Sequence, residues 1–170
     1  MFCTTIAISV FVYYVFSILQ VTKKDPLTGL LNRQAYYADI SGSPEEISAL
    51  VSVDMNGLKV INDTQGHTAG DTAISTVAGC FLRAVRRRFS VYRVGGDEFV
   101  IVCRKTSEDE VLALTKKIHE LVGETQYSCS IGYSYSADGK KPIDELLSES
   151  DAKMYAEKQL YYKEKKALGE

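Results

Sequence analysis

The residues whose types and spacing point to chemistry are acidic side chains at the ends of predicted strands. Asp54 follows the short apolar run Ala49–Val53, which predicts a buried strand. Asp97 and Glu98 follow a Gly-Gly turn between two further strand-like runs. If these strands are neighbours, the carboxylates meet at one edge of a sheet, where repulsion between them disfavours their charged forms. A hard divalent cation such as Mg²⁺ relieves that repulsion, and it usually takes one or two carboxylates together with substrate phosphates.

Two further positions suit a ligand that carries phosphates. Gly57 begins a predicted short helix over Gly57–Gln65, where unhindered backbone N–H groups form a natural phosphate cradle, although the GxxxxGK[ST] pattern of a P-loop is absent. Lys158 comes four residues after Met154, on the same face of the last predicted helix. It can point inward to a phosphate, or it can snorkel to the surface. For any one of the carboxylates, capping a turn is the alternative role.

The rest of the pattern predicts the elements that must position these residues. Amphipathic spacing and capping signals predict helices near Arg33 with Asn32 as the cap, over Thr72–Phe89, over Ser107–Val122, and from Ile143 onward. Strands are predicted over Val91–Val94, Glu98–Cys103 and Tyr127–Ser136. Large and small residues alternate along the last of these, which is typical of a half-buried antiparallel strand. The element order predicts an α+β fold with helices packed on a mainly antiparallel sheet.

Arginines close the predicted helix over Thr72–Phe89. Arg86, Arg87 and Arg88 stand in its last turn. Such a cluster can attract an anion, but cations at the C-terminal end of a helix also complement the helix dipole. We expect the structural role at this position.

Composition separates a globular part from the first residues. The 170-residue chain is 45% apolar and 25% charged, which suits one folded domain plus a short appendage, and its net charge of −2 argues against nucleic-acid binding. Residues 1–21 carry no charge, and Lys23 and Lys24 follow. We therefore predict an apolar helix over residues 1–22 that crosses the inner membrane, with a catalytic domain over residues 23–170 in the cytoplasm. A dimerising stalk is the alternative role for this helix.

Five motifs in order make the chain resemble the GGDEF-domain diguanylate cyclases over nearly all of Asp25–Lys163. They are DPLTGLLNR from Asp25, VDMNGLKVINDTQGHTAGD from Val53, GGDEF from Gly95, SIGYS from Ser130 and DAKMYAEK from Asp151. A lone GGDEF string is a weak signal, whereas five motifs at suitable spacings are a strong one. The resemblance implies a fold related to nucleotide cyclases and the polymerase palm, with a ferredoxin-like core. It also implies condensation of two GTP molecules into cyclic di-GMP and two pyrophosphates.

The resemblance also implies roles for the acidic residues. Asp54 and Asp97 match ligands of Mg²⁺ or Mn²⁺, and the Met55 carbonyl is expected to help them. Glu98 matches a second metal ligand or a catalytic carboxylate. Asp97 or Glu98 would help to deprotonate the attacking 3′-hydroxyl, and the choice between them stays open.

Other positions match residues that bind the nucleotide. Asn62 and Asp71 match the guanine readers, and a carboxylate suits guanine because it accepts from N1–H and N2–H. Lys158 matches the lysine that contacts the triphosphate, and Lys59 matches a recurrent lysine whose role is open. Each domain is expected to hold one GTP, so activity requires a homodimer.

Three positions depart from the family pattern. Asn56 stands where many members have a second aspartate, and Tyr162 stands where they often have an arginine that contacts phosphate. In the RxxD product-inhibition motif, Arg86 is present but Phe89 replaces the aspartate, so we expect little inhibition by cyclic di-GMP. The alternatives to an active cyclase are a GTP-binding sensor or docking module, and a related cyclase with a different product.

Overall fold

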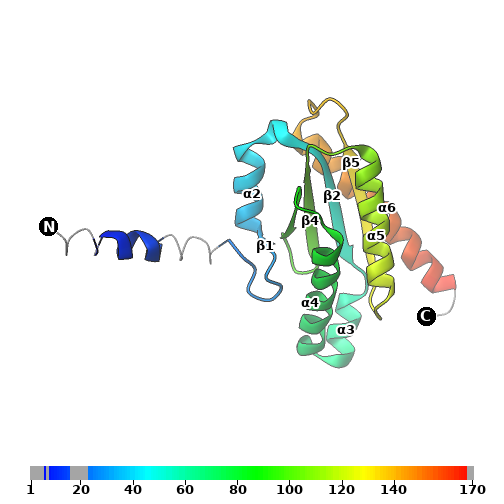
Figure 1. Cartoon of the computed structure of the whole chain (residues 1–170). Helices are drawn as coiled ribbons and strands as arrows, with labels where there is room; N and C mark the ends of the chain where they lie inside the picture. Colours follow the sequence, from blue (N-terminus) through cyan, green and yellow to red (C-terminus); the bar gives the residue numbers. More distant parts are fainter. Residues whose placement is uncertain (1–5, 7, 16–22, 168–170) are drawn as a thin grey trace.

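The structure is a computed structural model that describes residue 6, residues 8–15 and residues 23–167. Helices and strands follow one another along residues 23–167 as an α+β fold, as predicted (Figure 1). The elements are β1 (Leu31–Asn32), α2 (Arg33–Gly42), the 3₁₀ turn η1 (Pro44–Glu46), β2 (Ile47–Met55), α3 (Leu58–Gln65), α4 (His67–Ala84), β3 (Phe89–Arg93), β4 (Glu98–Arg104), α5 (Glu108–Gly123), β5 (Cys129–Tyr135) and α6 (Ile143–Ala167).

The strands form one five-stranded sheet in the order β1-β3-β4-β2-β5. Strands β3, β4, β2 and β5 pair in antiparallel fashion, whereas β1 runs parallel to β3. The sheet is therefore mixed, which corrects the prediction of a mainly antiparallel sheet. The sequence did not indicate the parallel pair because β1 has only two residues, too few to show the two-residue periodicity of a strand.

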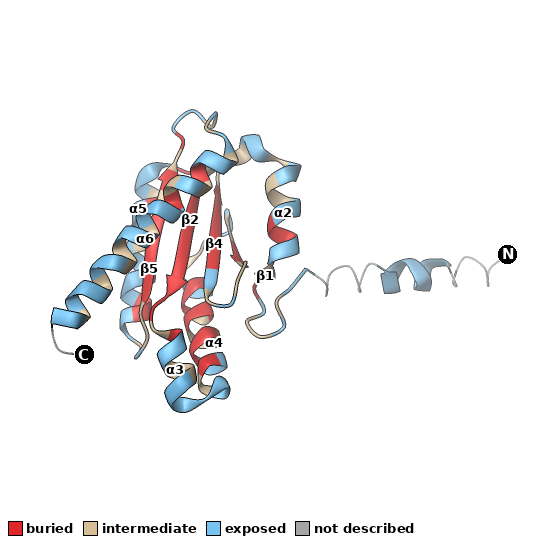
Figure 2. Ribbon diagram, turned by 180° about the vertical axis from the view of Figure 1, so that it is seen from behind, coloured by how far each residue is buried: buried red, intermediate tan, exposed pale blue. Residues whose placement is uncertain are grey.

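Helices cover both faces of the sheet and divide the core in two. One apolar cluster lies between the sheet and helices α4 and α5, and the other lies between the sheet and helices α2 and α6. Figure 2 shows α6 crossing the sheet in front of buried strands. Side chains alternate along β2, so Val51 and Val53 join the first cluster and Leu50 joins the second. Asp54 has the parity of Leu50, and this directs its side chain towards α6.

Strand β5 is covered on both faces, which corrects the prediction of a half-buried strand. Only Tyr133 and Tyr135 are partly exposed among its seven residues. A Cβ at Gly132 would come closer than 3.0 Å to the backbone of α6 at Ser150 and Met154. The small residues of the alternating pattern therefore form the seat of a helix and do not face solvent.

Helix α4 begins and ends about five residues earlier than the predicted range Thr72–Phe89. Val85 adopts an extended backbone with ψ of 149°, and its N–H bonds to the carbonyl of Phe81. The arginines 86–88 therefore lie in the loop that leads to β3. The interpretation that they complement the helix dipole is wrong, because they lie beyond the end of the helix.

The predicted apolar helix over residues 1–22 falls mostly outside the described residues. Residues 8–15 are helical and exposed. Among the residues that the structure describes, no helix combines the length and the apolar composition needed to cross a bilayer. The predicted span over residues 1–22 therefore stays a prediction, and so does the location of the protein.

Candidate active site

Asp54, the next-to-last residue of β2, is a buried carboxylate with a cationic partner. Its side chain faces α6, where Lys158 Nζ donates to its Oδ1 at 2.5 Å. Burial raises the pKa of Asp54, the contact with Lys158 only partly offsets this, and the charge of Asp97 raises it further. For Lys158, burial lowers the pKa, but the hydrogen bond and charge of Asp54 more than compensate and hold it above its usual value. Lys158 therefore points inward and does not snorkel to the surface.

The β3–β4 turn brings Asp97 next to the end of β2. The Met55 N–H donates to the Asp97 carbonyl oxygen at 3.1 Å, and Asp54 is the ladder partner of Glu98. Asp97 is close enough to Asp54 that its charge raises the pKa of Asp54. The strands predicted to be neighbours are neighbours, and the two aspartates approach each other at one sheet edge.

The fit of this edge to a metal ion depends mainly on Asp54. No cluster of three or more His, Cys, Asp or Glu side chains is found within the described ranges. Glu98 bends back over its own turn, so a Cβ on Gly95 would come closer than 3.0 Å to its carboxylate. Asp54 nevertheless suits a divalent cation. Burial disfavours its ionised form, so the carboxylate needs a positive partner, and the ammonium of Lys158 now fills that role.

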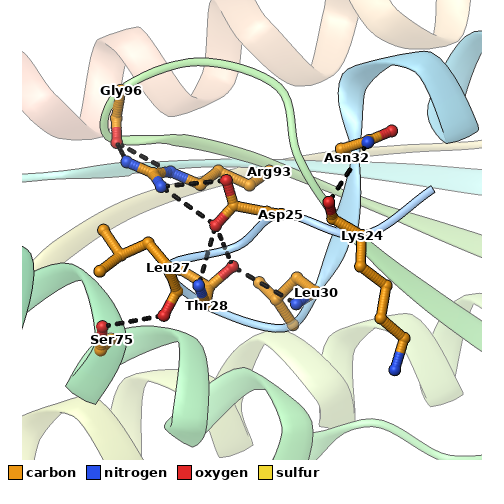
Figure 3. Close-up of polar contacts among 9 residues, drawn as sticks. All are labelled: Lys24, Asp25, Leu27, Thr28, Leu30, Asn32, Ser75, Arg93 and Gly96. Carbon is orange, nitrogen blue, oxygen red and sulfur yellow. Dashed lines mark hydrogen bonds and ion pairs between the residues drawn. The ribbon is translucent and has the colours of Figure 1, made fainter. Parts of the chain in front are cut away.

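Arg93, the last residue of β3, joins the acidic turn to the segment that enters the domain (Figure 3). Its guanidinium donates to the Gly96 carbonyl oxygen at 2.8 and 3.2 Å, and to both carboxylate oxygens of Asp25 at 3.1 and 3.2 Å. Asp25 also accepts from the backbone N–H and the hydroxyl of Thr28. Burial raises the pKa of Asp25, but the Thr28 and Arg93 contacts outweigh it and bring this pKa below its usual value.

The same entering segment also contacts α4, because the Ser75 hydroxyl donates to the Leu27 carbonyl at 3.3 Å (Figure 3). Arg93 thus links the turn with Asp97 to a segment that α4 also contacts. Sequence reasoning gave Arg93 no role. The available signal was its position, as a cation two residues before the Gly-Gly turn that precedes Asp97.

Gly57 precedes α3 with a left-handed backbone, φ +73°, which favours glycine. Its N–H donates to the Tyr162 hydroxyl oxygen at 3.2 Å. Tyr162 lies one turn beyond Lys158 on α6, so both side chains extend from the same face of that helix. Gly57 thus stands directly before a helix with its N–H bonded to a tyrosine of the same chain. Its role in binding phosphate stays a prediction.

Asn56, between Asp54 and Gly57, belongs to a neutral buried network. It is 6% exposed, its Oδ1 accepts from the Ser130 hydroxyl at 2.9 Å, and its N–H donates to the Ser128 carbonyl. An aspartate in its place would add a second negative charge to a buried site that already disfavours the charge of Asp54. The asparagine therefore limits the negative charge at this edge.

The predicted guanine readers lie on two helices that contact each other, α3 and α4. The Asn62 amide packs against Gly70, where a Cβ would come closer than 3.0 Å to the amide oxygen. Asp71, the next residue, is exposed and lines a hollow of about 440 Å³ together with Leu27. Asn62 is not one of the described residues that line this hollow. The structure thus places the two residues near each other on adjoining helices.

A second hollow, of about 350 Å³, lies between α2 and α6 and is lined by Glu98 and Asp151. Tyr36 lines it too. Its hydroxyl is buried and has no hydrogen-bond partner among the described residues, and burial raises its pKa to about 12. Sequence reasoning did not indicate this hollow, because it forms between helices that are far apart in the chain.

The loop after α4 borders a further hollow of about 220 Å³, which Arg86, Phe89 and Lys117 line. Glu110 is the acidic residue of this hollow. Its carboxylate already accepts from the Thr106 hydroxyl and the Ser107 N–H. The phenyl ring of Phe89 thus stands where the resemblance would place an aspartate.

The fold and the acidic edge define an α+β domain in which a hairpin turn carries carboxylates beside a buried aspartate at the end of β2. Residues 22–163 match the family described as diguanylate cyclase, GGDEF domain. The chain belongs to this family.

Named relatives and solved structures agree with this assignment. Diguanylate cyclase DgcM of Escherichia coli (strain K12) is 32% identical over 146 residues, which are 79% of this chain and 35% of that protein. Diguanylate cyclase DosC of the same strain is 32% identical over 152 residues, which are 79% of this chain and 32% of that protein. The chain therefore spans about a third of the length of these curated relatives.

Two solved structures show the same fold. The coiled coil and GGDEF domain of DgcB from Caulobacter crescentus, in complex with c-di-GMP, has a TM-score of 0.83 at 22% identity, covering 92% of this chain and 91% of that one. The GGDEF domain of PA1120 (TpbB or YfiN) from Pseudomonas aeruginosa has a TM-score of 0.73 at 27% identity, covering 81% and 89%.

Proposed function

We propose that this chain is a diguanylate cyclase domain, which condenses two GTP molecules into cyclic di-GMP and two pyrophosphates. Family membership and the named diguanylate cyclases among its relatives support the reaction class. The observation that carries the proposal is the buried Asp54 carboxylate, which lies beside the Asp97 turn and is compensated by a cation. A carboxylate in that position has a clear use in metal-assisted phosphoryl chemistry.

In this proposal Asp54, Asp97 and the Met55 carbonyl hold Mg²⁺ or Mn²⁺, and Glu98 is a further ligand or a catalytic carboxylate. A divalent cation held there would supply Lewis-acid chemistry to the α-phosphate and the 3′-hydroxyl. Asp54 would then have a divalent partner in place of the Lys158 ammonium. Lys158 then pairs with a phosphate, which has the same sign of charge as its present partner.

The other side chains act on the nucleotide directly. The 3′-oxygen of each GTP attacks the α-phosphorus of the other, so two phosphodiester bonds form and two bonds to pyrophosphate break. Asp97 or Glu98 of each domain accepts the proton of the attacking hydroxyl. The Gly57 N–H donates to a phosphate oxygen. Asn62 and Asp71 contact the guanine edge, and loss of a buried partner there costs about 1–3 kcal/mol, which favours GTP over ATP.

One domain holds one GTP, so the reaction needs two domains that face each other as a homodimer. Orientation and effective concentration then supply much of the rate. Activity should therefore rise with protein concentration until the dimer is saturated.

Product analysis tests this function directly. Purified protein is incubated with Mg²⁺ and GTP, and the products are separated by chromatography. We expect cyclic di-GMP from the wild-type protein and from Asp109→Asn, which changes an exposed carboxylate of α5. We expect no product from Asp97→Asn and a weaker preference for GTP over ATP in Asp71→Ala. A different product from the wild-type protein would identify a related cyclase instead.

A GTP-binding module is the second candidate, and one observation favours it. Within the described ranges the acidic side chains do not gather into a group of three, and Glu98 turns back over Gly95. GTP binding without turnover, even after two domains are joined by an engineered dimerisation segment, would support this candidate over the cyclase.

A further inference from the structure

Helix α6 contacts both the carboxylate proposed to bind the metal and the backbone N–H proposed to bind a phosphate of the substrate. Lys158 Nζ bonds to Asp54, the proposed metal ligand, and the Tyr162 hydroxyl oxygen accepts from the Gly57 N–H, the proposed phosphate donor. The two side chains are one helical turn apart and extend to the loop that follows β2. Helix α6 therefore bonds to both of these polar groups.

Tyr162 stands where the family pattern often has an arginine. Its ring packs edge-on against Tyr161, with 5.2 Å between the ring centroids. Its side chain is nevertheless 45% exposed, so it can move away from the loop without disturbing the core. A backbone N–H has a single hydrogen, so a phosphate oxygen and the tyrosine oxygen compete for the same donor.

We propose that Tyr162 is a latch, meaning a side chain that occupies the Gly57 N–H until a triphosphate displaces it. This inference rests on the proposed function, because it assumes that the phosphates of GTP bind at Gly57. Breaking one such hydrogen bond lowers an apparent affinity by roughly two- to tenfold, since its net contribution is modest in the presence of water. The latch therefore weakens GTP binding in this chain by that factor.

A tyrosine hydroxyl can also donate, so the competing role for Tyr162 is that of a direct phosphate ligand. The two roles predict opposite effects of removing the hydroxyl. A latch, when removed, leaves the Gly57 N–H free for the nucleotide and binding becomes tighter. A ligand, when removed, leaves one phosphate contact unmade and binding becomes weaker.

The test is calorimetric titration with a GTP analogue whose α–β bridge is a methylene group, so that no turnover occurs. We expect Tyr162→Phe to bind it roughly two- to tenfold more tightly than the wild-type protein. Tyr161→Phe is the matched control, since it removes the same atom from the neighbouring residue, and its affinity should equal that of the wild type. Equal or weaker binding by Tyr162→Phe would overturn the latch.

A measurement without nucleotide checks the contact itself. The Gly57 amide should exchange its hydrogen faster in Tyr162→Phe than in the wild-type protein or in Tyr161→Phe, and unchanged exchange would overturn the latch. If none of the three proteins binds the analogue, the proposed function fails and the latch fails with it. If all three bind with equal affinity, the latch alone fails.

Discussion

Replacement of Gly132 by alanine tests the packing that places α6 over the acidic edge formed by Asp54 and the Asp97 turn. A Cβ at this position would come closer than 3.0 Å to backbone atoms of Ser150 and Met154. Backbone atoms cannot rotate away as a side chain can, so α6 itself must move outward. Ordinary contact between non-bonded atoms requires about 3.5–4 Å, so the shift is roughly 1 Å or more.

The expected cost follows from the kind of strain introduced. Added volume in a well-packed interior costs typically about 1–3 kcal/mol, and a site bounded by backbone belongs at the upper end of that range. We therefore expect Gly132→Ala to lower the free energy of unfolding by about 2–3 kcal/mol. Movement of α6 also carries Lys158 away from Asp54, so the proposed cyclase activity should fall as well.

The assay is urea denaturation followed by circular dichroism, together with cyclic di-GMP production under saturating GTP. Gly79→Ala is the control, because Gly79 lies within α4 and no atom is found within 4 Å of its added Cβ. There the change should raise stability by up to about 1 kcal/mol through helix propensity. If Gly132→Ala has the same urea midpoint of unfolding as the wild-type protein, the close approach of α6 to β5 is contradicted.

Three further predictions concern charged residues. Lys158→Met should raise the pKa of Asp54 further and destabilise the fold by about 1–3 kcal/mol at pH 7. The folded-state pKa of Asp54 is raised, so Asp54 becomes protonated as the pH falls and no longer needs a cationic partner. The difference in free energy of unfolding between Lys158→Met and the wild type should therefore disappear in acid. Unfolding curves at several pH values measure it. The pKa of Asp25 is lowered in the folded protein, so Arg93→Met should lose part of the stability that Asp25 supplies above its unfolded pKa. The free energies of unfolding of the variant and the wild type should therefore converge in acid. A difference that stays constant at every pH would contradict the ion pair. Added cyclic di-GMP should inhibit steady-state turnover little, and strong inhibition that Arg86→Ala abolishes would show the opposite.

Local signals predicted the parts of the site that depend on neighbouring residues in the chain. The β-branched run before Asp54, the Gly-Gly turn before Asp97 and the glycines at both ends of α3 all specify backbone shape within a few residues. Because β2 and β4 pair directly, these local elements were enough to bring Asp54 towards Asp97.

Features that depend on distant segments could not be predicted in the same way. The parallel pairing of β1 rests on two residues, and the burial of both faces of β5 depends on α6, which the alternating pattern does not encode. The end of α4 was also misplaced, since the apolar stripe continues into Val85 after the backbone has become extended. The contact of Tyr162 with Gly57 joins residues 105 positions apart.

Helix α6 follows all the other described elements in the chain, and this order has a consequence during synthesis. Lys158 is 104 residues beyond Asp54, so a ribosome exposes the aspartate long before it makes the lysine. Chains fold from the N-terminal part as they emerge, and a nascent domain that lacks α6 leaves Asp54 without its cation and the small-residue face of β5 open. Translation must therefore pass α6 before the acidic edge can assume its mature form, so the proposed nucleotide site would appear only when synthesis of the domain is nearly complete.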